Sequence, residues 1–105
     1  TTRQYMAIFN TDAALDMSCT ERELRRWLQM IAAIFPMTAE ETSYADYTVE
    51  GGTARIAWKE LPDRVIALVR LKRMEVTLAY SEGVPADARA HFSKQFQMHT
   101  LRGGG

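Results

Sequence analysis

Hydrophobic and polar residues alternate along this chain with two different periods, and these periods divide it into strands and helices. Over residues 3–10, Tyr5, Ala7 and Phe9 point to one side, and Met6 and Ile8 point to the other. This alternation predicts a first strand that is buried on both faces and is ended by the polar residues that follow it.

Residues 20–35 carry the clearest helical signal. Thr20 and Glu23 have the spacing of a capping box, in which each side chain accepts a hydrogen bond from the backbone N–H of the other residue. Pro36 should end the helix, because the residue before a proline disfavours helical geometry. The helix has one apolar stripe, which consists of Leu24, Trp27, Leu28, Ile31 and Phe35.

The segment that follows, residues 38–41, is either one further helical turn or a loop. Gly51 and Gly52 then stand between two alternating runs, which predicts a hairpin with a two-residue turn. Pairing that is symmetric about these glycines places Val49 opposite Ala54, and gives the hairpin one apolar face.

A second hairpin is expected over residues 64–80, after a turn at Pro62 and Asp63. This run is too long for one ordinary strand. Folding it at Lys72 and Arg73 matches side chains of similar character on both faces. These two turn residues lack the glycine or asparagine that a tight hairpin turn favours.

The last helix is expected to begin at Pro85, which suits a first helical turn, and to stop at Gly103. Its apolar stripe consists of Ala88, Phe92 and Phe96. The element order is therefore β-α-β-β-β-β-α. We predict a two-layer α+β fold with a mostly antiparallel meander sheet, packed by two helices on one face. The first strand should join an edge, beside the last strand or the second.

Composition supports one domain, which we place at residues 1–102, with 103–105 as a flexible glycine tail. The chain has 105 residues, of which 47% are hydrophobic and 25% are charged, as in ordinary globular domains. No apolar run approaches the ~18 residues of a membrane-spanning helix, so no membrane association is expected. Cys19 is the only cysteine, which fits a reducing compartment and suggests a cytoplasmic protein.

The formal net charge of the chain is zero, but its halves differ. Residues 1–50 hold four arginines against eight acidic residues, and residues 51–105 hold nine basic against five acidic residues. A chain without net charge self-associates more readily than a highly charged one. The outer face of the predicted sheet is also unusually apolar, and such a face usually needs cover. We therefore predict a non-enzymatic interaction module, a homodimer or a partner-binding protein, with an interface at Ile66, Leu68, Thr77 and Ala79.

Two binding alternatives rest on other features. The charged hairpin 64–73 could contact the phosphates of a nucleic acid, although acidic neighbours oppose this and no aromatic residues alternate with the bases. The basic patch would consist of Arg55, Lys59, Arg70, Lys72 and Arg73. Alternatively, the six methionines could line a pliable pocket between helix and sheet for a small apolar ligand.

Residues with catalytic chemistry are few. His91 and His99 are eight residues apart, whereas metal ligands on one helix usually sit four apart. Cys19 precedes a helix start, which favours the thiolate, but no histidine partner is evident. Glu40 and Glu41 fall in a polar segment. We therefore expect no catalytic residue, metal or cofactor, and no enzymatic activity.

The chain ends in Leu-Arg-Gly-Gly-Gly, with the glycines at Gly103, Gly104 and Gly105. This ending resembles the tail of ubiquitin-like modifiers and sulfur carriers over about four residues. The resemblance implies a carrier or modifier that is activated at its C-terminal glycines. Those folds begin with a hairpin followed by a helix, whereas here one strand precedes the helix, and the tail follows a helix rather than a strand.

Overall fold

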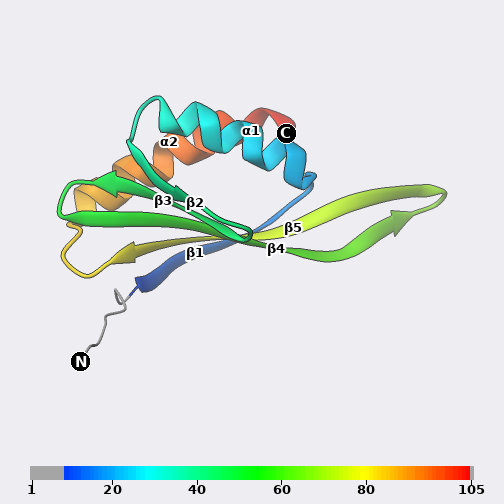
Figure 1. The fold of residues 1–105 in the computed structure, drawn as a ribbon. Coiled ribbons are helices and arrows are strands. Elements are labelled where there is room, and N and C mark those ends of the chain that lie inside the picture. Colours follow the sequence, from blue (N-terminus) through cyan, green and yellow to red (C-terminus); the bar gives the residue numbers. More distant parts are fainter. Residues whose placement is uncertain (1–8, 105) are drawn as a thin grey trace.

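The computed structural model describes residues 9–104, which form one antiparallel sheet and two helices. In space the strand order is β1-β5-β4-β3-β2, and both helices lie on the same face of the sheet (Figure 1). This confirms the two-layer α+β fold and the order β-α-β-β-β-β-α. It also places β1 beside β5, which is one of its two predicted positions. The elements are β1 (Phe9–Met17), α1 (Glu21–Ala32), β2 (Met37–Glu40), β3 (Tyr44–Val49), β4 (Gly52–Ile66), β5 (Val69–Ser81) and α2 (Ala86–Gly104).

Helix α1 begins at the predicted capping box. Thr20 Oγ1 accepts a hydrogen bond from the Glu23 backbone N–H at 3.1 Å, and Glu23 Oε1 accepts one from the Thr20 N–H at 2.9 Å. Two N–H groups that lack helical partners are thereby satisfied. The helix ends at Ala32, earlier than predicted, and Phe35 packs against the core from the connection that follows.

The hydrophobic core lies between the helices and the sheet and is rich in aromatic rings. Phe92 of α2 is fully buried and its ring centre lies 5.0 Å from that of Phe35, 5.4 Å from Tyr47 and 6.1 Å from Tyr80. The Tyr47 hydroxyl donates a hydrogen bond to the Leu28 carbonyl at 2.8 Å, so this buried polar group is satisfied. Trp27, a member of the predicted stripe of α1, and Trp58 of β4 also lie in the core.

The first two strands differ from the sequence prediction. The strand predicted at 3–10 lies mostly outside the described residues, and β1 continues to Met17 instead of stopping at the polar residues 10–12. At an edge strand, polar side chains can face solvent while the backbone stays paired, here with β5. Residues 37–40 form neither a helical turn nor a loop, because this segment pairs with β3 as the opposite edge strand β2.

The β3–β4 hairpin forms, but its register is shifted by two residues. Val49 pairs with Gly52 and Tyr47 pairs with Ala54, so the turn lies at Glu50 and Gly51. Gly51 has φ +83°, which glycine adopts without steric penalty. Since a shift of two residues leaves every side chain on its original face, the predicted apolar face is retained.

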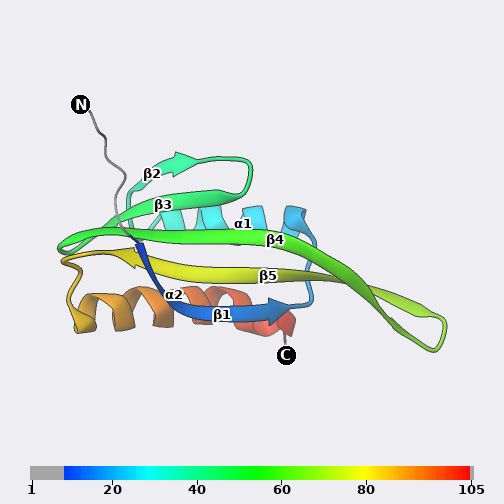
Figure 2. The ribbon, with the colours of Figure 1, turned by 90° about the horizontal axis from the view of Figure 1, so that it is seen from below.

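The second predicted hairpin is wrong. Strand β4 passes through Pro62 and Asp63 with a bulge instead of turning there, and the chain reverses at Ala67 and Leu68. Lys72 and Arg73, the predicted turn, lie within β5. Strands β4 and β5 therefore form one long ribbon, whose outer part projects well beyond the helices and the other strands (Figure 2).

Helix α2 packs on the sheet through the predicted stripe. Phe92 and Phe96 are fully buried and Ala88 is half-buried. The helix continues through Gly103 to Gly104, so Gly103 is not the stop that the sequence predicted. In the part of the chain that the structure describes, no helix is both long enough and apolar enough to cross a membrane.

Candidate functional site

The projecting part of the β4–β5 ribbon, residues 61–73, is the most unusual surface of the molecule, and we call it the arm. On its flanks, β1 pairs with β5 only as far as Met74, and β3 pairs with β4 only as far as Ala57. The arm is therefore a two-stranded ribbon (Figures 1 and 2). An isolated ribbon of this kind is only marginally stable in water.

Local sequence explains how the arm is built. Pro62 has no backbone N–H to donate, and a strand tolerates it at a bulge; the pairing is irregular between Leu61 and Arg64. The Pro62 carbonyl instead accepts a hydrogen bond from Arg73 at 3.2 Å. At the tip, Ala67 adopts φ +53°, a left-handed conformation that is uncommon for alanine.

The tip of the arm exposes large apolar side chains on both faces. Leu68 is 100% exposed, and Val65, Ile66 and Val69 are each more than half exposed. Val65 and Ile66 are consecutive in a strand, so they point to opposite faces. The tip therefore leaves apolar side chains uncovered on both faces of the ribbon.

The predicted interface residues do not come together. Ile66 and Leu68 lie at the tip of the arm, whereas Thr77 and Ala79 lie within the body of the sheet, where Ala79 is buried. Thr77 is eight residues along β5 from Val69, the pairing partner of Ile66, or roughly 26 Å at ~3.3 Å per residue. The sequence prediction had placed all four residues on one outer sheet face, because it put the turn at Lys72 and Arg73 instead of Ala67 and Leu68.

The predicted basic patch is also divided. Arg55 lies on the body of the sheet, where it makes two hydrogen bonds to Asp46, at 2.7 and 2.9 Å, and stacks between the rings of Phe9 and Tyr44. The hydrogen bonds with Asp46 raise the pKa of Arg55. Lys59 is 3.5 Å from Glu75. Arg55 is therefore engaged within the chain, whereas the Lys59 side chain remains 70% exposed.

The other three members of the basic patch lie on the arm. Arg73 is 2.7 Å from Asp16, and this hydrogen bond lowers the pKa of the Asp16 carboxyl. Arg70 and Lys72 are 3.7 and 3.9 Å from Asp63, with side chains that remain 71% and 57% exposed. At these distances the pairing is weak, so Arg70 and Lys72 still present their charge to solvent.

No protein-family model, characterised protein or solved structure matches this chain.

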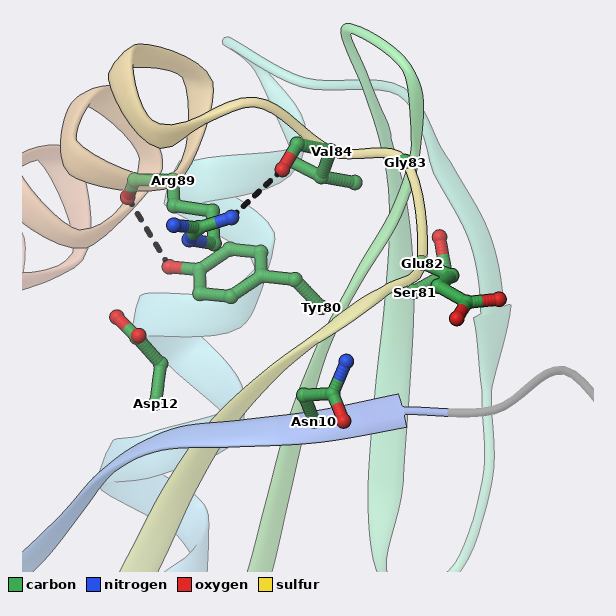
Figure 3. Close-up of a pocket in the computed structure, with 8 residues that line it drawn as sticks. All are labelled: Asn10, Asp12, Tyr80, Ser81, Glu82, Gly83, Val84 and Arg89. Atoms are coloured by element: carbon green, nitrogen blue, oxygen red, sulfur yellow. Dashed lines mark hydrogen bonds between the residues drawn. The ribbon is translucent and has the colours of Figure 1, made fainter.

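The end of the molecule opposite the arm holds two cavities. One, of about 300 Å³, has a polar lining. There the Arg89 guanidinium donates a hydrogen bond to the Val84 carbonyl at 2.7 Å, and the Tyr80 hydroxyl donates one to the Arg89 carbonyl at 3.1 Å (Figure 3). Burial raises the pKa of Tyr80 to about 12. The other residues that line this 300 Å³ cavity are Asn10, Asp12, Ser81, Glu82 and Gly83.

The second cavity, of about 280 Å³, lies between the β3–β4 turn and the start of α2. Its apolar lining comes from Phe35, Val49 and Ala88, and its two carboxylates come from Glu50 and Asp87. The sixth lining residue is His91. The sequence offered no signal for this arrangement, because its residues come from three separate segments.

The remaining candidates for chemistry are dispersed. Glu40 is bound by Arg25 at 2.8 Å, and Glu41 is exposed. His91 lies edge-on to Phe35 at 5.4 Å. Within residues 9–104, no cluster of three or more histidine, cysteine, aspartate or glutamate side chains is arranged to hold a metal ion.

The methionines are not gathered into one pocket either. Met74 is buried in the core, whereas Met30 and Met98 are exposed; Met6 lies outside the described residues. Gly103 and Gly104 belong to α2, and Gly105 is also outside the described part. The apolar-ligand and tail-activation hypotheses stay predictions.

Cys19 is buried, and burial together with the nearby Glu23 carboxylate raises its pKa to about 11. A raised pKa means that at pH 8 only about one thiol in a thousand is ionised, and the thiolate is the reactive form. We expect iodoacetamide to modify native Cys19 far more slowly than the same cysteine in urea-unfolded protein, followed by mass spectrometry. Equal rates in the two states would contradict this burial.

Proposed function

We propose that this chain is a non-enzymatic interaction module that self-associates through its arm. The observation that carries the proposal is the apolar tip, where Leu68 is 100% exposed and Val65, Ile66 and Val69 are each 54–58% exposed. Such side chains are ordinarily placed in a core. Cys19, the single buried thiol, favours a reducing, cytoplasmic setting for this module.

Energetics favour a partner that covers the tip. Complete burial of one valine, leucine or isoleucine side chain contributes about 1.5–3 kcal/mol, and several such side chains meet at the tip. Association costs about 4–15 kcal/mol in lost freedom of motion. Burial of the tip side chains, together with other contacts, can offset a cost of this size. The absence of net charge supports a second copy as the partner, because two copies do not repel each other strongly.

The test is the oligomeric state of an arm-tip variant. We expect the wild type to sediment as a dimer, and the double variant Ile66→Lys with Leu68→Glu to sediment as a monomer. A matched control is Met30→Lys with Ile34→Glu, which places the same charges on exposed apolar positions of the α1 region and should leave the dimer intact. A wild type that is monomeric at high concentration, or an arm-tip variant that stays dimeric, would overturn the proposal.

A further inference from the structure

We infer that the arm of one copy docks into the acidic cavity at the far end of a second copy, in a two-fold antiparallel dimer. This inference rests on the proposed self-association and adds the surface that receives the arm. That surface is the 280 Å³ cavity with an apolar lining and two carboxylates, Glu50 and Asp87.

The arm and the far end carry opposite charges. The arm holds Arg64, Arg70, Lys72 and Arg73 against one acid of its own, Asp63; Asp16 of β1 also faces it. Glu23 also lines a pocket together with Arg70 and Lys72. Four cations thus face three carboxylates, which leaves a small excess of positive charge on the arm. Three of the cations have side chains that are more than half exposed.

At the far end the balance is reversed. In the described residues, no ion pair joins a cation to any of its acids, Asp12, Glu50, Glu82 and Asp87. Among the described residues, the one cation that lines either cavity is Arg89, whose guanidinium donates to the Val84 carbonyl rather than to a carboxylate. Counted over these residues, this end has an excess of negative charge.

The cavity matches the arm in chemistry as well as in charge. Its apolar lining, Phe35, Val49 and Ala88, suits an aliphatic side chain, and Leu68 is fully exposed at the tip. Arg70 lies two residues beyond Leu68 and pairs with Val65 across the ribbon. Seating Leu68 in the cavity would bring the charge of Arg70 to the carboxylates beside it, which fixes the register of the contact.

The dimensions allow both contacts to form at once. The molecule is 52 Å long, and each strand of the arm has about six residues, or roughly 20 Å. In Figure 1 the arm lies at one end, and the β3–β4 turn and the start of α2 lie at the other. When two copies lie side by side in antiparallel orientation, each arm reaches the far end of the other copy. The two identical contacts close the assembly as a two-fold dimer.

Charge reversal on each surface tests this pairing. The arm variant is Arg70→Glu with Lys72→Glu, and the end variant is Glu50→Lys with Asp87→Lys. We expect each variant alone to dimerise roughly a hundredfold more weakly, because like charges then face each other. An equal mixture of the two variants should form a heterodimer, visible by native mass spectrometry, and a chain that carries all four substitutions should recover the homodimer.

The controls separate the possible outcomes. Glu41→Lys with Gln97→Lys adds positive charge away from the far end and should leave the dimer unchanged. Circular dichroism checks that each variant is folded, and a variant that cannot fold would not be rescued by mixing. An end variant that dimerises like the wild type, or a mixture that stays monomeric, overturns the docking site while the arm-tip result still stands. A monomeric wild type overturns the self-association itself.

Discussion

Replacement of Phe92 by alanine is expected to lower the free energy of unfolding by about 3–5 kcal/mol, the usual cost of removing a phenylalanine from a core. Phe92 is fully buried, and its ring meets Phe35, Tyr47 and Tyr80 at centre distances of 5.0 to 6.1 Å. These neighbours come from β3, β5 and the connection after α1. Loss of the ring therefore leaves a cavity at the point where both layers meet.

Urea denaturation at one fixed protein concentration measures this loss, since the stability of a self-associating protein depends on concentration. Met98→Ala is the matched control. Met98 is on the same helix but is 60% exposed, so its truncation should change stability by about 0.5 kcal/mol or less. A Phe92→Ala variant that loses under ~1 kcal/mol would show that the aromatic cluster contributes little to holding the helices on the sheet.

Features that depend on local chemistry could be predicted from the sequence. The capping box of Thr20 and Glu23 needs only two residues three positions apart, and it formed as expected. The apolar stripes of both helices were also correct, except that Phe35 lies beyond the end of α1, because helical periodicity identifies a buried face without reference to the rest of the fold. The antiparallel meander and the edge position of β1 were predicted as well, whereas β2 was not predicted and the boundary between β4 and β5 was placed at the wrong turn.

Strand register and turn position could not be predicted in the same way. Alternation has a period of two, so any register that differs by two residues places the same side chains on the same faces. The predicted pairing about Gly51 and Gly52 was thus off by two residues, yet gave the correct apolar face. The turn at Ala67 has no glycine or asparagine to mark it, and Pro62 with Asp63 resembles a turn although it forms a bulge.

The arm was missed for a physical reason. The segment Arg-Val-Ile-Ala-Leu-Val-Arg-Leu, residues 64–71, has the composition of a buried strand, and its pattern does not show that it forms a ribbon that projects beyond the core. Ile66 and Leu68 were nevertheless identified as apolar positions in need of cover. The sequence did not indicate that these two residues lie far from Thr77 and Ala79, because this distance depends on where the ribbon turns.

Replacement of Gly51 by alanine is expected to destabilise the protein by about 2–5 kcal/mol. Its φ of +83° lies in a region that costs a residue with a side chain about 1–2 kcal/mol. An added Cβ would also lie only 2.5 Å from the Gly83 carbonyl oxygen and 2.9 Å from Pro85 Cδ. The β3–β4 turn and the β5–α2 connection are packed backbone against backbone here, so the overlap requires one of them to move, at a further ~1–3 kcal/mol.

Gly83→Ala is the matched comparison, because Gly83 also has positive φ, at +102°, but its added Cβ would meet one neighbouring atom, the Gly51 carbonyl oxygen, at 3.2 Å. Thermal unfolding of the two variants separates conformational strain from steric overlap. We expect the Gly51 variant to melt at least several degrees below the Gly83 variant, since 1 kcal/mol shifts the midpoint of a domain this size by about 4–8 °C. Equal midpoints would mean that the two turns are not in close contact. Because Glu50 and Glu82 flank these glycines, close packing of the turns is also what holds the acidic far end in one shape.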